Sequence, residues 1–515
     1  MVKDIEKYET VIGLEIHVQL KTKSKMFCGC DNKGEDKPAN TTVCPICTGH
    51  PGVLPVINKQ AIEWAVLAAL ALHFKIPKTS YFDRKSYFYP DLPKGFQISQ
   101  YGAPIGQDGY LLINLKDHER RVRLERLHLE EDSAKLLHEA DKSASYVDYN
   151  RSGTPLLEIV TKPDIQSPEE AKIFLQELRL VMRYLDISDA DMEKGHLRCD
   201  ANISLRPKPE YFEAFPKIET QEFYPKTEIK NMNSFGAVEH ALAYEIERQA
   251  KLWDSGKPPA FQTTRGWNDK LGETLEQRGK EEKHDYRYFP EPDLPPLVFG
   301  KKLFDEIHNK MVELPYEKRE RLEKQLGLTS YEAKILTENK HLVNFFEEVI
   351  SELKAWLISL EEIEGTEEEI WKKNKKKLVS KVASWIISRL LKLLNEARTE
   401  VNESKITPEN FAELITLIYQ NKINQNTAQV ILGEMFKSGK DPSNIMEEKD
   451  LGQLDKSKDL EKIVENVVNN NPEIVKQYIA GKTTVLQYLI GQVMKETKGR
   501  ADPKVVRELL IYKLK

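Results

Sequence analysis

Hydrophobic and polar residues alternate strictly along residues 11–20, where every second side chain is aliphatic and the opposite face carries Glu15, His17 and Gln19. This period of two predicts a strand with one buried face. The same alternation predicts strands over 121–132, 196–206 and 227–231. In the first of these it slips by one residue near Glu125 and Arg126, which predicts a β-bulge that re-aims His128 and Glu130.

Apolar residues at helical spacing predict helices over 59–72 and over 168–185, the second with Ser167 as its N-cap. From about residue 333 the pattern is almost purely helical. Further helices are expected from Thr407-Pro408 onward and at 425–437, 458–468, 484–497 and 503–514, with separators at Asp441-Pro442 and Asn471-Pro472. We therefore expect an α+β fold, with a strand-rich first part of about 290 residues and an all-helical remainder.

The composition limits the function classes. The 515 residues include 77 Lys+Arg and 82 Asp+Glu, a net charge of −5, which argues against binding nucleic acid by bulk positive charge. The chain has no run of about 18 apolar residues, and its mixed-charge start lacks the apolar core of a secretory signal. We expect a cytoplasmic protein of two to four domains.

Four of the five cysteines lie close together in the sequence, as Cys28, Cys30, Cys44 and Cys47. Two close pairs of thiols in a reducing compartment predict a tetrahedral Zn²⁺ site rather than disulfides. Four protein ligands close the coordination sphere, so this zinc is expected to be structural. Cys199 falls on the apolar face of its strand and is expected to pack in the core.

Carboxylates, histidine and basic residues recur on the polar faces of the predicted strands. Such a face suits Mg²⁺ and phosphate groups, and it suggests a pocket that handles ATP. The alternative is an ordinary solvated strand face. The usual nucleotide motif is absent, since Gly481-Lys482-Thr483 is preceded by Lys476 where a P-loop needs glycine. Glu158 lies in the apolar run 156–160, where an unpaired carboxylate would be costly, so we expect a metal or cationic partner there.

Long motifs in matching order resemble the family of the B subunit of the bacterial aspartyl/glutamyl-tRNA amidotransferase, over nearly the whole chain. The motifs that carry the resemblance are residues 11–18, 84–101, 126–132, 148–160, 197–204, 285–293 and 491–499. The resemblance implies a cradle-shaped catalytic domain with the zinc site at 1–295, a helical connecting domain at 296–405 and a helical tRNA-binding tail domain at 406–515.

The activity implied by the resemblance is ATP-dependent phosphorylation of the side-chain carboxylate of Glu-tRNA(Gln) and/or Asp-tRNA(Asn), followed by attack of ammonia. The family supplies the ammonia from an amidase A subunit, with a small C subunit as third partner. The present chain shows no Gly/Ser-rich amidase stretch, so it is expected to be one part of a heterotrimeric ligase.

The resemblance also implies site residues. The catalytic set comprises Glu15, His17, Glu130, Glu131, Glu158, Asp200, Glu228, Lys230 and Arg265. Mg²⁺ is assigned to His17, Glu130, Glu131 and Glu158, and phosphate neutralisation, hence ATP binding, to Lys230 and Arg265. An ordinary ion pair remains the alternative for Glu228 and Lys230. The tRNA contacts are assigned to Lys495, Lys498, Arg500, Lys504 and Arg507, against the alternative of a solvated basic helix face.

Two other functions and one unassigned segment remain. The archaeal counterpart of the family acts only on Glu-tRNA(Gln) and carries an inserted domain, for which this sequence shows no long additional α+β block. A zinc-containing tRNA-binding protein without catalysis is the second alternative.

The segment 350–377 contains an acidic block and the basic run 372–377, looks longer than in the family, and has no assigned role. A solvated helix pair or loop is its simplest interpretation.

Overall fold

The computed structural model describes residues 5–116, 118–138, 144–214, 223–278, 285–358, 366–451, 458–497 and 500–514. The chain divides into two compact units, residues 1–315 and 316–515. None of the helices in the described ranges has both the length and the hydrophobicity needed to span a bilayer. The α+β fold class and the all-helical C-terminal region are confirmed. The division into three domains at residues 295 and 405 stays a prediction.

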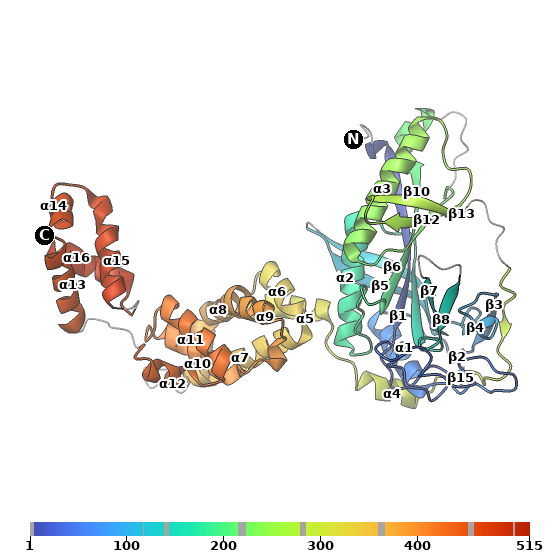
Figure 1. The fold of residues 1–515 in the computed structure, drawn as a ribbon, viewed down its shortest axis with the longest axis horizontal. Coiled ribbons are helices and arrows are strands. Elements are labelled where there is room, and N and C mark those ends of the chain that lie inside the picture. Colours follow the sequence, from blue (N-terminus) through green and yellow to red (C-terminus); the bar gives the residue numbers. More distant parts are fainter. Residues whose placement is uncertain are drawn as a thin grey trace. The chain divides into compact units, whose positions relative to one another are not determined.

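An eight-stranded sheet forms the centre of the first unit (Figure 1). Its strands, in spatial order, are β13 (Glu273–Arg278), β12 (Thr263–Asn268), β11 (Thr227–Lys230), β10 (Leu197–Pro207), β1 (Tyr8–Gln19), β9 (Pro155–Thr161), β6 (Glu119–Glu131) and β5 (Gly106–Asn114). All neighbours are antiparallel except β11 and β12, which are parallel. The predicted slip in β6 is confirmed as a register shift between Leu124 and Arg126.

Three helices cover one face of this sheet: α1 (Lys59–Ala71), α2 (Pro168–Tyr184) and α3 (Phe235–Asp254). Figure 1 shows α2 and α3 side by side along it. The aliphatic side chains of β1, such as Ile12 and Ile16, are completely buried against these helices in one continuous core. Because successive side chains of a strand point to opposite faces, the polar residues of β1 face away from the helices. The sheet therefore has one core face and one polar face.

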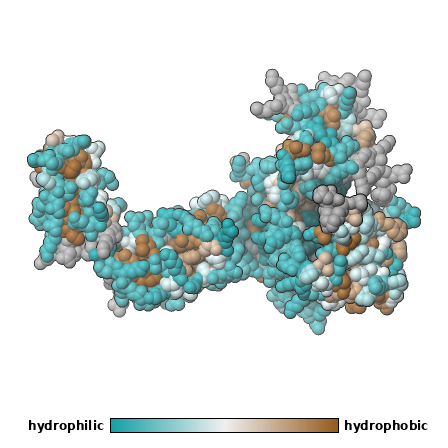
Figure 2. Space-filling model, in the orientation of Figure 1, coloured by the Kyte–Doolittle hydropathy of each residue, from teal (hydrophilic) through white to brown (hydrophobic). Residues whose placement is uncertain are grey.

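Smaller elements lie beside the polar face. β3 (Asp83–Ser86), β4 (Phe96–Ser99) and β14 (Phe289–Pro290) form a three-stranded sheet, and β4 packs against β6. Two further pairs join β2 (Thr79–Ser80) to β15 (Leu297–Val298) and β7 (Lys135–His138) to β8 (Ser145–Asp148). Figure 2 shows hydrophobic residues on part of the surface of this unit, and Leu54, Val56 and Val298, the last in β15, are among its exposed large hydrophobic side chains.

Helices make up the rest of the described chain. They are α4 (Lys301–His308), which packs on α1 within the first unit, and α5 (Pro315–Arg321), α6 (Ser330–Thr337), α7 (Lys340–Ile358), α8 (Glu367–Trp385), α9 (Leu391–Ala397), α10 (Pro408–Tyr419), α11 (Gln425–Ser438), α12 (Pro442–Glu448), α13 (Lys458–Asn470), α14 (Pro472–Ile479), α15 (Leu486–Glu496) and α16 (Pro503–Lys513). α13, α15 and α16 enclose a hydrophobic core of their own. The predicted N-cap Ser167 is confirmed by its side-chain hydrogen bond, and the helix predicted to open at Thr407-Pro408 has Thr407 as its N-cap.

The two predicted separators also begin short helices that were not expected. Pro442 and Pro472 occupy the first turn of α12 and α14. Proline is well suited to this position because its fixed φ is helical and its missing N–H would have no partner there. In the unassigned segment, α8 begins after the capping box of Thr366 and Glu369. Residues 359–365, which include half of the acidic block, lie outside the described residues, and the other half forms the first turn of α8.

Candidate active site on the polar face of the sheet

Three adjacent strands bring acidic and imidazole side chains into one row. In the antiparallel register, His17 of β1 lies opposite Glu158 of β9, and Glu158 lies opposite His128 of β6. Glu15 and Glu130 lie two positions away from His17 and His128 on the same strands, and therefore on the same face. We call Glu15, His17, His128, Glu130 and Glu158 the acid–histidine cluster.

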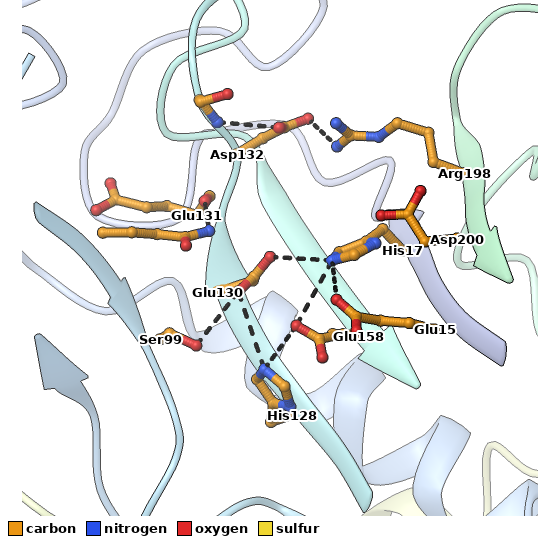
Figure 3. A network of polar contacts seen from close by, with 12 residues as sticks. Glu15, His17, Ser99, His128, Glu130, Glu131, Asp132, Glu158, Arg198 and Asp200 are labelled. Carbon is orange, nitrogen blue, oxygen red and sulfur yellow. Dashed lines mark hydrogen bonds and ion pairs between the residues drawn. The ribbon is translucent and has the colours of Figure 1, made fainter. Parts of the chain in front are cut away.

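His17 lies at the centre of the cluster. Its Nε2 atom is 3.5 Å from Glu158 Oε2, 3.6 Å from Glu130 Oε1 and 3.8 Å from Glu15 Oε1 (Figure 3). The side chains of Glu130 and Glu158 are only 4% and 5% exposed, whereas that of Glu15 is 37% exposed. The three carboxylates thus converge on one point from a buried side and an open side.

His128 forms the buried wall of the cluster, and it was not among the predicted site residues. Its Nε2 atom is 3.1 Å from Glu158 Oε2 and 3.9 Å from Glu130 Oε2, and Ser99 donates a hydrogen bond to Glu130 (Figure 3). The signal that could have identified His128 is its position two residues before Glu130, on the same side of the predicted strand.

Burial and charge oppose each other in the cluster. Burial alone would raise the pKa of the Glu158 carboxyl, but His128 and His17 hold it well below its usual range. Burial alone would lower the pKa of His128, but Glu158 and Glu130 raise it to about 9. Burial, and then the charge of Glu158, raises the pKa of Glu15. The site therefore concentrates negative charge that histidine balances only in part.

The donor set fits a divalent cation. Glu15, His17 and Glu158 form one group, and His128, Glu130 and Glu158 form another, and within each group one ligand atom per residue lies within 4.8 Å of the others. Carboxylate oxygens are the ligands that Mg²⁺ prefers, and a few of them suffice because Mg²⁺ keeps several waters. The geometry thus unites three of the four predicted Mg²⁺ ligands and adds His128.

Glu131, the fourth predicted ligand, is turned away from the cluster (Figure 3). Its carboxylate pairs with Lys94 and accepts a hydrogen bond from the backbone N–H of Ile98. Adjacent residues of a strand point to opposite sides, so Glu130 and Glu131 do not converge on one ion.

Asp200, Glu228 and Lys230 form a second charged group next to Glu15. Asp200 of β10 lies opposite Glu15 in the register. Lys230 Nζ is 2.7 Å from Asp200 Oδ2 and 3.1 Å from Glu228 Oε1. The Lys230 side chain is 40% exposed, so the ammonium group is anchored and still accessible to a phosphate from the solvent side.

Arg265 lies on the other face of the sheet. In the parallel register it lies opposite Ile229, a residue of the core. Its Nε atom is 3.2 Å from Glu245 Oε1, on α3, and donates a hydrogen bond to Thr274. The structure therefore does not bring Arg265 to the acid–histidine cluster.

Two further cations border the cluster, and neither was in the predicted set. Arg126 Nη2 is 3.6 Å from Glu158 Oε1. Lys85, from β3, lies 5.0 Å above the ring of Tyr286; burial lowers its pKa, but Glu130 and its other anionic neighbours raise it well above the usual value. A cavity of about 430 Å³ lined by Gly13, Glu15, Arg126 and Asn202, among others, lies next to this group.

The four clustered cysteines meet as predicted, with all four sulfur atoms within 4.8 Å of one another. A hydrogen bond from Cys28 lowers the pKa of Cys47 to about 4 despite burial, so one thiolate is already favoured. Ser152, three residues before β9 begins, donates a hydrogen bond to the backbone carbonyl of Cys47. The cysteine cluster thus adjoins the strand that carries Glu158. Cys199 is buried in the core, as predicted.

The predicted tRNA contacts are dispersed over the C-terminal helices. Lys495, Lys504 and Arg507 are exposed. Arg500 is half-buried and pairs with Asp450, with Nη1 2.7 Å from Oδ2. Lys498 lies outside the described residues. Of the four described residues, the structure therefore leaves three accessible to a ligand.

Comparison with known proteins identifies the class. A family model described as the GatB/GatE catalytic domain matches residues 10–305, and one described as a GatB domain matches residues 366–514. The B subunit of the aspartyl/glutamyl-tRNA(Asn/Gln) amidotransferase of Persephonella marina is 46% identical over 99% of this chain and 100% of its own. That of Thermotoga maritima is 46% identical over 98% of each chain, and that of Carboxydothermus hydrogenoformans 44% identical over 99% of each.

The α+β domain with its acid–histidine cluster is thus a catalytic domain of the GatB/GatE class. The chain belongs to the family of the B subunits of aspartyl/glutamyl-tRNA(Asn/Gln) amidotransferases.

Proposed function

We propose that the acid–histidine cluster is the centre of the ATP-dependent transamidation of Glu-tRNA(Gln) and/or Asp-tRNA(Asn). An oxygen of the mischarged side-chain carboxylate attacks the γ-phosphorus of ATP, and the bond to ADP breaks. Ammonia then attacks the acyl carbon, phosphate leaves with its bridging oxygen, and the new amide loses a proton. The single observation that carries the proposal is the convergence of Glu15, Glu130 and Glu158 on His17.

Each residue of the site would have a role that follows from its position. His17, Glu130 and Glu158, with Glu15 at the open side, would hold Mg²⁺, which when bound supplies positive charge to the phosphates. Arg126 and Lys85 border the same space and would neutralise charge on the transferred group. Lys230 would do so from the other side of Glu15, and the adjoining cavity offers room for part of ATP. Arg265 and Glu131 are left out of this set because both are engaged elsewhere.

Zinc and partner proteins complete the proposal. Zn²⁺ held by Cys28, Cys30, Cys44 and Cys47 would fix the segment before β9, and so the position of Glu158. The relatives are B subunits by name, which supports a multisubunit enzyme. We propose an amidase partner that supplies ammonia, a small third subunit and a cytoplasmic location, where charged tRNA is found. Exposed Leu54, Val56 and Val298 are consistent with association.

The test compares two variants of β1 and β9 in the complete complex. Glu158→Gln keeps the shape of the side chain and removes its charge. Glu9→Gln is the matched control, because Glu9 lies on the same face of β1 but pairs with Arg206, away from the cluster. With mischarged tRNA, ATP and ammonium chloride, we expect Glu158→Gln to reduce amide formation and tRNA-dependent ADP release at least about 100-fold.

The control should retain its activity, and both variants should bind tRNA as the wild type does. Undiminished amide formation by Glu158→Gln would refute the proposed site. If neither the wild-type complex nor the variants released ADP with mischarged tRNA, the alternative of a zinc-containing tRNA-binding protein would replace the proposal.

A further inference from the structure

Helix α8 carries a concentration of positive charge that the proposed active site does not use. Between Ile370 and Asn395 the sequence contains no aspartate or glutamate. The basic residues of this stretch are Lys372, Lys373, Lys375, Lys376, Lys377, Lys381, Arg389 and Lys392. In a chain with a net charge of −5, such a stretch creates a local field opposite to that of the whole molecule.

Four of these lysines form one exposed surface, Lys372, Lys373, Lys376 and Lys377, which we call the α8 lysine face. Residues four positions apart lie above one another on a helix, so the four side chains make two adjacent columns. The opposite side of α8 is anchored in the helical unit: Ile370 and Leu378 are buried.

A polar contact fixes the middle of the helix as well. Tyr419 of α10 donates a hydrogen bond to Asn374 Oδ1 at 2.7 Å, and the Lys377 ammonium lies 5.1 Å from the centre of the same tyrosine ring. The α8 lysine face is therefore presented on a helix that is held in place by packing, so its charges are preorganised.

The lysines of this face form no direct ion pair within the described part of the chain, although Glu367, Glu368 and Glu369 lie in the first turn of the same helix. No carboxylate of a described residue lies within ion-pair distance of the four lysines, whereas some other exposed helical lysines are paired, for example Lys324 with Glu320 and Lys392 with Glu396. Burial, and next the charge of Lys377, lowers the pKa of Lys381. Like charges four residues apart destabilise a helix, so the arrangement carries a cost that a ligand with negative charge would remove.

We propose that the α8 lysine face binds the sugar–phosphate backbone of the tRNA substrate. This inference rests on the proposed function for the identity of the RNA. A polyanion offers phosphates in a regular row, which matches two columns of lysines. A protein partner fits less well, because the centres of protein interfaces are enriched in aromatic residues and depleted in lysine. This contact lies outside the residues 495–507 predicted to bind tRNA.

The test is the salt dependence of tRNA binding by the complete complex. We expect the quadruple variant K372Q/K373Q/K376Q/K377Q to bind tRNA at least about tenfold more weakly at ~0.1 M salt. The slope of log K against log salt should become less steep by about 2 to 4, since each lost phosphate contact contributes roughly 0.9. The turnover number at saturating tRNA should not change, because these residues do not contact the reacting groups.

Two control variants separate charge from structure. Replacing the same four lysines by arginine should keep the affinity and the slope. The double variant K324Q/K392Q removes exposed helical lysines that are paired with glutamate, and it should leave tRNA binding unchanged.

An unchanged slope and affinity in the quadruple variant would overturn the proposal. Loss of tRNA binding together with loss of complex assembly in gel filtration would also overturn it, in favour of a protein-docking surface. Failure of the wild-type complex to form amide would contradict the proposed function alone, since the salt dependence is measured by binding.

Discussion

Glu245 holds Arg265, a predicted catalytic residue, in an ion pair on the helix-covered face of the sheet. This carboxylate of α3 is completely buried and pairs with Arg248, with Nη2 2.8 Å from Oε2, and with Arg265, with Nε 3.2 Å from Oε1. Glu245→Gln keeps the volume but removes the carboxylate that pairs with Arg248, and it leaves Arg265 only the carboxylate of Glu276, with Nη1 3.8 Å from Oε2. Removing one partner of a buried ion pair costs about 3–5 kcal/mol. Arg265→Met leaves the Glu245–Arg248 pair intact, so we expect a smaller loss of about 2 kcal/mol.

The unit that contains Glu245 spans residues 1–315. An unfolding entropy of about 2.1 cal/mol/K per residue gives roughly 0.65 kcal/mol/K for a unit of this size. Glu245→Gln should therefore lower the Tm of this unit by about 5–8 °C, and Arg265→Met by about 3 °C. Differential scanning calorimetry of the assembled complex measures both shifts, with the transition of the helical unit as an internal reference.

Kinetics at a temperature well below both transitions decide the role of Arg265. Because its side chain lies on the helix-covered face, we expect Arg265→Met to keep kcat for amide formation within about threefold of the wild type. Lys230→Met, on the polar face, should lower kcat by about tenfold or more. A 100-fold loss of kcat in Arg265→Met without a change in Tm would refute this reasoning and return Arg265 to the phosphate site.

Two further predictions concern the cysteine cluster and an acidic residue near the sheet edge. Cys47→Ser should abolish the binding of one zinc per chain, measured by plasma mass spectrometry, and lower the Tm of the first unit; full zinc content in the variant would contradict the assignment. Burial raises the pKa of the Asp164 carboxyl, but the hydrogen bonds of Arg123 outweigh burial and hold this pKa below its usual value. The Asp164 carboxylate therefore stabilises the fold above pH ~4, and this stabilisation is lost as the pH falls further. Asp164→Asn should therefore lower the unfolding free energy at pH 7 by less than about 1 kcal/mol. Near pH ~3 the unfolding free energies of the variant and the wild type should become equal. A difference between them that grew toward low pH would contradict this prediction.

The sequence allowed the strand faces of this fold to be predicted, because their periodicity is local. The alternation in 11–20 correctly separated Ile16 from His17, and the slip near Arg126 correctly indicated a bulge in β6. Adjacent strand residues point to opposite faces, yet Glu131 was assigned to Mg²⁺ together with Glu130. The motif that implied both residues gave no information on side-chain direction, whereas the structure shows Glu131 bound to Lys94.

Contacts between distant segments could not be predicted in this way. Arg265 lies on the core face because β12 runs parallel to β11 with Arg265 opposite Ile229, and nothing within residues 263–268 specifies that register. Lys85 reaches the cluster through the packing of a separate small sheet. The contact of Ser152 with Cys47 joins residues 105 positions apart. Such pairings depend on topology, so periodicity and spacing alone do not specify them.

The two faces of β1 make its length as important as its composition. Insertion of a single residue before Glu15 would move the rest of the strand by half a period, so Ile16 and Val18 would exchange places with Glu15 and His17. One added codon would thus place Glu15 and His17 against the helices and aliphatic side chains in the acid–histidine cluster. An insertion of two residues would restore the faces, but it would move His17 two positions along β9. His17 would then no longer lie opposite Glu158. Natural length variation in this protein is therefore expected in the loops around β1 and not within the strand.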